Sequence, residues 1–293
     1  NKQLLFLRQL QFEFVTIDEA TDWTLEWIKA FPRQFDLIVG VPRSGMFVAS
    51  LIALKLGKPL TTPALLGKGE YWQTSIVKNP LPLGPQNHVL IVDDSMDSGR
   101  SMSKAVDQVR SVNRDIDISR GCLIIREEAK HLLDLYHRVV SPPRLFEWNI
   151  LHRKIASYMR VGVLAVEMDG ILCEPCPSAI EGQEKAYSEW LLNARPYLVP
   201  NFEIDAVVTG RLEKYRPQTE QWLANNGVGY KELRMRQDPG TDDGEDSHSD
   251  FFVGELLRIK PDLCWTCRRP LSDMVWKRTR IPTLCIDDMT LLN

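Results

Sequence analysis

The chain has 293 residues, of which 44% are hydrophobic and 26% charged, and its formal net charge is −3. This balance is typical of a globular protein with enough apolar material for two domains. A weakly acidic total gives no electrostatic reason to expect nucleic acid as a partner, although it would hide a small basic patch. We find no apolar run long enough to cross a bilayer and no secretory signal, so we expect a cytoplasmic protein without membrane contact.

The first half of the chain alternates between strand-like and helix-like segments. Buried strands are predicted at residues 36–41, 88–92 and 121–126, and helices at residues 46–56 and 102–112. A possible capping box of Thr16 and Glu19 precedes a further amphipathic helix at residues 20–31. Strand, turn and helix in repetition predict an α/β fold in which helices cover both faces of a parallel sheet.

A second α/β unit is expected after residues 141–144, where Pro142 and Pro143 disfavour both a helix interior and a central strand. The alternation then restarts, with strands predicted at residues 162–166, 204–208, 261–265 and 282–286 and helices at residues 184–193 and 216–226. We therefore predict two domains, residues 1–143 and residues 144–293.

The polar run after the strand at residues 88–92 has the composition of a sugar-phosphate site. The strand delivers Asp93 and Asp94 to its carboxyl end, where open α/β sheets bind their ligands. A helix then begins in a small, hydroxyl-rich turn, where unpaired backbone N–H groups and the helix dipole favour an anion. An ordinary helix cap is the alternative, because Asp and Ser cap helices in many proteins.

The whole run from Val89 to Met102 resembles the motif of type I phosphoribosyltransferases that binds 5-phosphoribosyl-1-diphosphate. That motif is an apolar strand, two acidic residues, two spacers, Asp, Thr or Ser, Gly, any residue, and Thr or Ser. The resemblance implies that Asp93 and Asp94 bind the ribose hydroxyls and that Asp97 is the general acid/base toward a purine-like base. A loop-capping carboxylate is the alternative for Asp97. The 5-phosphate would be bound by Ser98, Gly99, Arg100 and Ser101.

An upstream turn resembles the pyrophosphate loop of the same family. It contains Arg43, which would pair with phosphate oxygens, then Ser44, and Gly45, which would allow close backbone approach. The implied reaction exchanges diphosphate for a nitrogen base at C1 of the sugar, and it is usually assisted by Mg²⁺.

Residues 67–87 stand where the family carries a flexible lid. Lys68, Tyr71 and Lys78 would close over the pyrophosphate, and a merely mobile loop is an equal alternative.

The second unit resembles haloacid dehalogenase-like (HAD-like) phosphatases over most of residues 162–288. Residues 163–172 resemble motif one, an apolar strand followed by Asp-x-Asp-Gly, and residues 206–211 resemble motif two. The resemblance implies a Rossmannoid domain. The first Asp of motif one is the family's nucleophile, and here it is Glu167, whose extra methylene misplaces the attacking oxygen.

Two further parts of the phosphatase pattern are missing. No lysine stands near residues 251–253, where motif three is expected, and residues 264–267 replace the expected acidic motif. We therefore predict a catalytically inactive domain. Its vestigial site would consist of Glu167, Asp169, Thr209 and Arg211.

Four of the six cysteines form two Cys-x-x-Cys pairs, which are expected at the carboxyl edge of neighbouring strands. Four thiolates at this spacing suit a structural zinc, and unligated buried thiols or a redox pair are the alternatives. The candidate ligands are Cys173, Cys176, Cys264 and Cys267.

The sequence thus predicts a phosphoribosyltransferase whose partners are 5-phosphoribosyl-1-diphosphate and a nucleobase or nucleotide. A non-catalytic sensor of nucleotides and a structural protein that retains the fold are the alternatives. The base and the oligomeric state, including a homo-oligomer, stay open.

Overall fold

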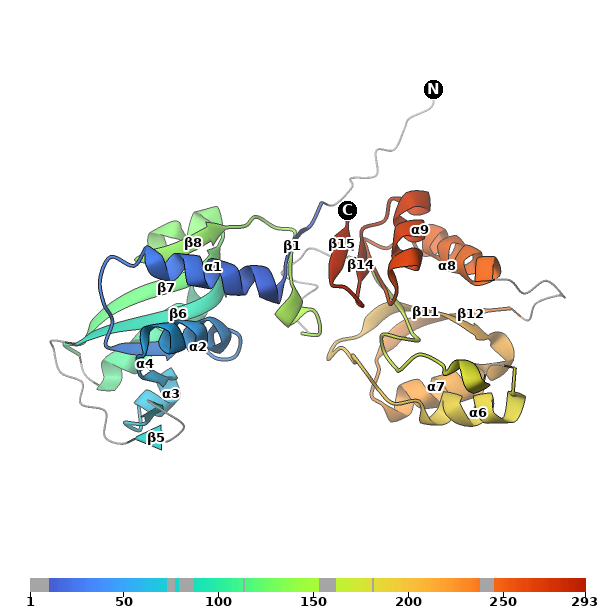
Figure 1. The fold of residues 1–293 in the computed structure, drawn as a ribbon, viewed down its shortest axis with the longest axis horizontal. Coiled ribbons are helices and arrows are strands. Elements are labelled where there is room, and N and C mark those ends of the chain that lie inside the picture. The colour runs from blue at the N-terminus through green and yellow to red at the C-terminus, as the bar shows by residue number, and fades with distance from the viewer. Residues whose placement is uncertain are drawn as a thin grey trace, which may run out of the picture. The chain divides into compact units, whose positions relative to one another are not determined.

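The computed structural model describes residues 11–72, 77–78, 87–112, 114–152, 162–180, 182–237 and 245–293. The chain divides into two compact units, one of Val15–Pro142 and the other of Asn1–Phe14 together with Pro143–Asn293. Each unit has its own sheet and its own core (Figure 1). The predicted α/β class is confirmed for both. Within the described residues, no helix has the length and apolar character needed to cross a membrane.

The unit of residues 15–142 is a sheet with helices on both faces. Its strands are β2 (Leu37–Gly40), β3 (Leu60–Thr61), β4 (Tyr71–Trp72), β5 (Val77–Lys78), β6 (His88–Met96), β7 (Asp117–Ile125) and β8 (Leu135–Val139). Its helices are α1 (Ile17–Lys29), α2 (Gly45–Leu56), α3 (Pro63–Leu66), α4 (Arg100–Val112) and the 3-10 helix η1 (Glu127–Leu132). The strand order is β5-β4-β3-β2-β6-β7-β8, and all pairs are parallel except those that involve β4 and β5.

Local sequence explains where these elements begin and end. The predicted capping box of Thr16 and Glu19 is present at the start of α1. Helix α2 ends at Gly57, which takes the left-handed conformation typical of a helix C-terminus. Strand β6 runs four residues further than predicted, to Met96, because its polar end continues the ladder with β7.

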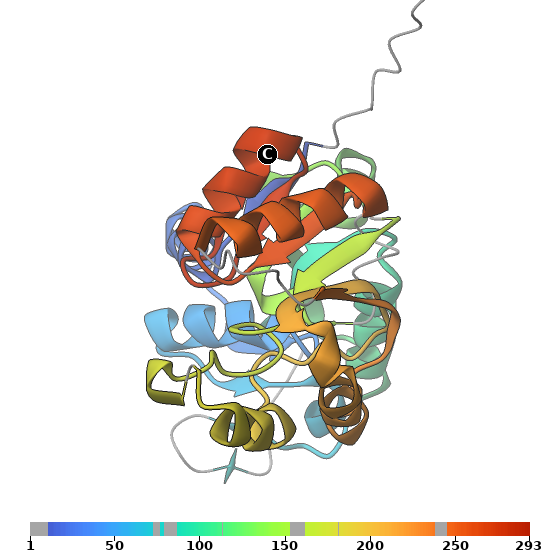
Figure 2. The same cartoon turned by 90° about the vertical axis from the view of Figure 1, so that its right-hand side faces the viewer.

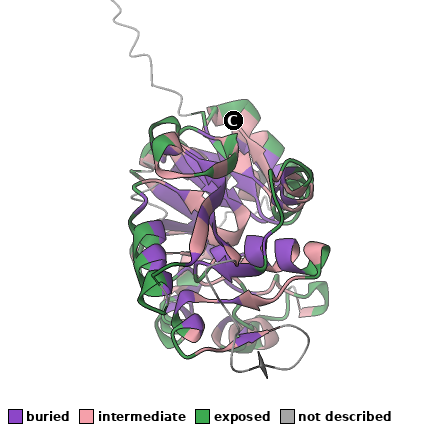
Figure 3. Cartoon of the chain, turned by 90° about the vertical axis from the view of Figure 1, so that its left-hand side faces the viewer, coloured by how far each residue is buried: buried purple, intermediate pink, exposed green. Residues whose placement is uncertain are grey.

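The chain connections place a ligand site at one edge of this sheet. Strand β2 leads through α2 to β3 on one side, whereas β6 leads through α4 to β7 on the other side. Because such crossovers are right-handed, the two helices lie on opposite faces, and the carboxyl ends of β2 and β6 form the topological switch point. The central strands are buried, and the helices turn their exposed residues outward (Figure 3).

The second unit is a second doubly wound sheet. Its strands are β1 (Glu13–Val15), which pairs with β9 (Arg144–Phe146), and β10 (Leu164–Glu167), β11 (Ile204–Leu212), β12 (Tyr230–Arg236), β13 (Leu263–Thr266), β14 (Thr283–Cys285) and β15 (Thr290–Leu292). Its helices are α6 (Glu184–Asn193), α7 (Arg216–Asn225), α8 (Glu245–Ile259), α9 (Arg269–Thr279) and the short 3-10 helices η2 (Glu147–Asn149), η3 (Ser178–Ile180) and η4 (Glu213–Tyr215).

The large sheet of this unit has the order β12-β11-β10-β13-β14-β15, and only β15 is antiparallel. Helices α6 and α7 pack together, as do α8 and α9. Apolar residues of α7 and of α8 and α9 belong to different cores, so the two helix pairs cover opposite faces. The order of connections reverses at β10, whose carboxyl end is therefore the switch point of this sheet.

Candidate functional site

The turn between β2 and α2 lies against the carboxyl end of β6. Backbone N–H of Val41 donates to the carbonyl of Val92 at 2.9 Å. A Cβ atom on Gly45 would lie 2.7 Å from Oδ1 of Asp93 and 3.0 Å from the Val92 carbonyl oxygen. Only glycine fits at such a distance, so the structure brings the turn that holds Arg43 and Ser44 directly beside the acidic end of β6.

Asp93 and Asp94 are buried side by side at that end. Their residues are 8% and 2% exposed, and Oδ1 of Asp93 accepts the Asp94 backbone N–H at 3.0 Å. Burial, together with the neighbouring Asp94 carboxylate, raises the pKa of Asp93 well above its usual range. A hydroxyl donor or a cation beside this pair would favour the ionised form of Asp93, as expected of a site that binds sugar hydroxyls.

The hydroxyl-rich turn leads from β6 into α4. Gly99 has φ +72°, and a Cβ atom there would lie 2.8 Å from Cδ1 of Leu132. The backbone therefore folds tightly under the start of α4, with Gly99 buried. The neighbours Ser98, Arg100 and Ser101 are all exposed. Their side chains and the first N–H groups of α4 are thus open to an anionic ligand.

Asp97 lies between this turn and the end of the neighbouring strand β7. Its Oδ1 is 3.7 Å from Nε of Arg126, whose Nε is also 3.5 Å from a carboxylate oxygen of Glu128. Arg126 was not among the site residues predicted from the sequence. Its position as the first residue after β7, at the edge that carries Asp93 and Asp94, was the available signal.

Only part of the predicted lid lies within the residues that the structure describes. Tyr71 is 8% exposed and belongs to β4, so its side chain is packed rather than free, whereas Lys68 is exposed. The side chain of Lys78 and residues 73–76 and 79–86 lie outside the described residues.

The sequence of residues 15–150 matches the family model of the phosphoribosyl transferase domain. The orotate phosphoribosyltransferase of Sulfurisphaera tokodaii is 31% identical over 124 residues, which cover 42% of this chain. The chain spans 60% of the length of that curated relative.

Two solved structures align with the chain at lower identity. The xanthine-guanine-hypoxanthine phosphoribosyltransferase of Helicobacter pylori is 16% identical, with a TM-score of 0.38, over 48% of this chain and 95% of its own. A chain of the Pnkp1/Rnl/Hen1 complex is 15% identical, with a TM-score of 0.30, over 94% of this chain and 88% of its own.

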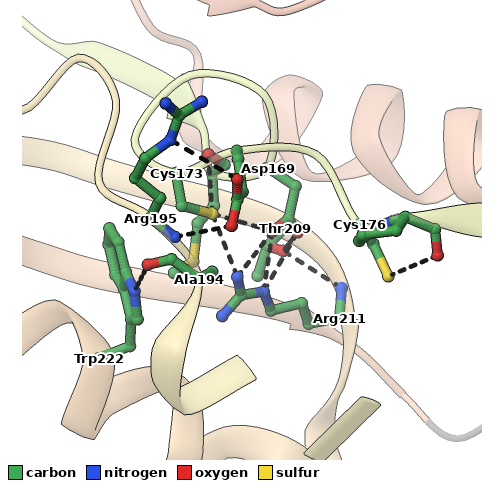
Figure 4. Close-up of polar contacts among 11 residues, drawn as sticks. Asp169, Cys173, Cys176, Ala194, Arg195, Thr209, Arg211 and Trp222 are labelled. Carbon is green, nitrogen blue, oxygen red and sulfur yellow. Dashed lines mark hydrogen bonds and ion pairs between the residues drawn. The ribbon is translucent and has the colours of Figure 1, made fainter. Parts of the chain in front are cut away.

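Outside residues 15–150, a second polar cluster occupies the switch point of the other sheet. The guanidinium of Arg211 grips the carboxylate of Asp169 through Nη2 at 2.7 Å and Nε at 3.1 Å (Figure 4). The hydroxyl of Thr209 donates to the same carboxylate at 3.1 Å. The side chain of Arg211 is fully buried and stacks on Trp190, with 5.1 Å between its guanidinium carbon and the ring centroid. Asp169 is thus engaged by a fixed internal cation.

Glu167 lies in the same cluster but has different partners. One carboxylate oxygen accepts the backbone N–H of Cys267 at 2.7 Å, and the other is 3.9 Å from Nε2 of His248. The imidazole of His248 packs directly over Gly210, where a Cβ atom would overlap it. His248, in the first half of α8, occupies the region where the phosphatase pattern predicts a lysine, and it was not predicted as a site residue.

The zinc prediction is not supported. Among the described residues, which include all four sulfurs, no three His, Cys, Asp or Glu side chains converge as metal ligands would. Strand alternation turns Cys264 into the core beneath α8 and α9, whereas Cys173 and Cys267 belong to the core of the opposite face. Cys176 lies apart from Cys173 (Figure 4). Burial raises the pKa of the Cys173, Cys264 and Cys267 thiols, which favours neutral S–H groups.

Proposed function

We propose that the chain transfers a 5-phosphoribosyl group between diphosphate and a nitrogen base. The observation that carries this proposal is the contact between Gly45 and Asp93 at the switch point of the sheet. It puts a turn suited to diphosphate beside a carboxylate pair suited to ribose hydroxyls. The family match of residues 15–150 supports the same activity.

Each part of the ligand has a candidate partner in this domain. Arg43 and Ser44 would hold the diphosphate, Asp93 and Asp94 the ribose hydroxyls, and the turn of Ser98, Gly99, Arg100 and Ser101 the 5-phosphate. In the reaction, the bond between C1 and the diphosphate oxygen breaks as a ring nitrogen bonds to C1. Asp97 would accept the proton that this nitrogen loses, and Arg126, 3.7 Å away, would orient its carboxylate.

The residues present fit Mg²⁺ as the cofactor of this site. Mg²⁺ prefers carboxylate oxygens, and it typically binds one or two protein carboxylates together with ligand oxygens and water. Asp93 and Asp94 supply two such carboxylates, which are buried side by side at the end of β6. When bound, Mg²⁺ would neutralise the negative charge that grows on the departing diphosphate.

Binding of 5-phosphoribosyl-1-diphosphate tests the ligand site proposed at the carboxyl ends of β2 and β6. Calorimetry with Mg²⁺ should show one site in the wild-type chain, and the double variant Asp93→Asn, Asp94→Asn should lose it. Asp107→Asn removes an exposed carboxylate of α4 and should bind as the wild type does. Absence of binding by the wild type would overturn the proposal.

Turnover distinguishes an enzyme from a nucleotide sensor. A panel of purine and pyrimidine bases should identify at least one that releases diphosphate. With that base, Asp97→Asn should lower kcat by roughly a hundredfold to ten-thousandfold and change the affinity for 5-phosphoribosyl-1-diphosphate little. A chain that binds this ligand but turns over no base would support the sensor instead.

We also propose that residues 144–293 form a HAD-like domain without phosphatase activity. The observation that favours this is the engagement of Asp169 by Arg211, because a carboxylate in a bidentate ion pair is poorly placed to exchange protons. Glu167 in place of the nucleophilic Asp of the phosphatase motif also supports this proposal. Robust hydrolysis of a phosphomonoester panel, abolished by Glu167→Ala, would contradict this proposal.

A further inference from the structure

One segment of the second unit is strongly basic, which the net charge of the whole chain conceals. Residues 258–280 contain seven Lys or Arg and only two Asp, although the chain as a whole has more acidic than basic residues. The segment covers the end of α8, strand β13 and all of α9. These two helices lie side by side in both views (Figures 1 and 2).

Four of the seven cations are accounted for by local contacts. Arg258 pairs with Glu255, and Arg278 pairs with Asp250. Arg269 pairs with Asp273 at 2.8 Å and with Asp288 at 3.2 Å. Arg268 is next to the buried Cys267 and interacts with its thiol. The remaining three, Lys260, Lys277 and Arg280, are exposed and have no acidic partner within the described part of the chain.

These three cations share one end of the unit. Lys260 follows α8, Arg280 follows α9, and each helix leads into one of the adjacent parallel strands β13 and β14. Cys264 and Thr283 are paired in this ladder, so Lys260 and Arg280 stand at nearly the same level beyond the amino ends of the two strands. Lys277 belongs to the last turn of α9.

The two helix ends have the same backbone geometry. Lys260 and Arg280 have φ +53° and +58°, and their N–H groups bond back to the fourth residue before them, at 2.8 and 3.0 Å. Glycine is the usual residue in this left-handed position, and a long side chain there is disfavoured. Both helices nevertheless end in a long cation, which points to a use for the charge besides neutralising the helix dipole.

An aromatic ring completes the surface. Trp276 is half-buried, and the guanidinium carbon of Arg280 lies 5.3 Å from its ring centroid. The apolar residues Leu271 and Val275 of the same helix face the sheet, so α9 offers charge rather than a membrane-inserting face. Cations beside an aromatic ring, with a guanidinium over that ring, are the combination that binds the backbone and stacks the bases of a single strand.

We propose that the surface formed by Lys260, Trp276, Lys277 and Arg280 binds single-stranded nucleic acid. The three cations contact backbone phosphates, and the stacked Arg280 and Trp276 contact a base. This inference is independent of the phosphoribosyl transfer proposed above. It gives the chain a nucleic-acid partner, which the net charge alone gave no reason to expect.

Fluorescence anisotropy of the full chain with a labelled 12-nucleotide RNA, and with DNA of the same sequence, tests the proposal. The triple variant Lys260→Gln, Lys277→Gln, Arg280→Gln should bind at least tenfold more weakly at low salt. The slope of log affinity against log salt should fall by about two, since each lost phosphate contact on a single strand accounts for about 0.7. The difference between RNA and DNA shows which of the two the surface prefers.

A matched variant controls for net charge. Lys29→Gln, Lys104→Gln, Arg110→Gln removes three exposed cations of the other unit and should keep the wild-type affinity. An equal loss of oligonucleotide affinity in both triple variants would overturn the proposal. Displacement of the bound oligonucleotide by 5-phosphoribosyl-1-diphosphate would also overturn it. Displacement by polyglutamate as effective as by unlabelled oligonucleotide would assign the surface to an acidic protein instead. No binding by the wild type at low salt would also overturn it.

Discussion

The side-chain amide of Asn293 binds both backbone polar groups of Phe12. Its oxygen accepts the Phe12 N–H at 2.6 Å, and its nitrogen donates to the Phe12 carbonyl at 3.2 Å. The Phe12 ring is 3% exposed and belongs to the main core of the second unit. Residues 11–14 are thus a structural part of that unit, although 128 residues of the other unit, Val15–Pro142, separate them from the rest of it.

Phe12→Ala should destabilise the second unit by about 3–5 kcal/mol, because it removes a buried aromatic ring from a packed core. Scanning calorimetry that resolves the two units should show a lower Tm for one transition only. Leu54→Ala is the control, since Leu54 is 80% exposed on α2 and should change stability by roughly 0.5 kcal/mol or less. An unchanged Tm in Phe12→Ala would mean that the segment is dispensable.

Asp93→Asn should stabilise the protein at neutral pH while it weakens ligand binding. The pKa of Asp93 is raised in the folded state, so the folded chain keeps a proton that the unfolded chain loses. Stability is therefore lost as pH rises from the ordinary carboxyl pKa toward the raised one. Asn does not titrate, so the Tm advantage of the variant should grow as the pH rises above the ordinary carboxyl pKa. A Tm difference that is independent of pH would refute this.

Gly99→Ala should abolish binding of 5-phosphoribosyl-1-diphosphate. Its φ of +72° strains any side chain, and a Cβ atom would press on Cδ1 of Leu132, so Leu132 or the turn itself must shift. We expect a stability loss of about 1–2 kcal/mol from the backbone alone. Gly57→Ala carries similar strain at φ +62° in open space and should leave binding intact. Calorimetry on both variants separates loss of the turn from loss of stability.

Arg211→Met should destabilise the second unit by about 2–3 kcal/mol, somewhat less than the usual cost of breaking a fully buried ion pair, because Asp169 is partly exposed. The double variant Asp169→Asn, Arg211→Met should lose less than the sum of the two single changes. Arg216→Met breaks pairs of α7 that are a third exposed and should cost under about 1 kcal/mol. Urea unfolding of Arg211→Met, Asp169→Asn, the double variant and Arg216→Met measures these losses of stability. If the losses of the two single variants add up to that of the double variant, Asp169 and Arg211 are not energetically coupled.

The central strands β2 and β6 and the second half of β7 could be predicted because they are apolar, whereas the short β3, β4 and β5 and the partly polar β8 carry no such signal. Asp93, Asp94 and Gly99 follow a strand in a spacing that fixes their order along one sheet edge. The proximity of Gly45 to Asp93 and of Arg126 to Asp97 could not be derived in the same way, since it depends on which strands are neighbours. Strand order is a long-range property that local periodicity does not encode.

The second unit shows why the cysteine interpretation failed. The spacing of Cys264 and Cys267 is that of zinc ligands, but Cys264 lies within β13 and its alternation points the sulfur into a core. The place of residues 11–14 was also unreadable, because four residues give no periodic signal. Lys260 and Arg280 are close because β13 and β14 are adjacent, although 20 positions separate them in the sequence.

The chain passes between its two units twice, after Phe14 and after Pro142. A protease that cuts only once, near residue 142, would therefore not release an independent second unit. It would yield two fragments that still share one folded core, because the first fragment supplies Phe12 to the second. Cut chains should stay together through gel filtration and separate only in denaturant, as complementing fragments do.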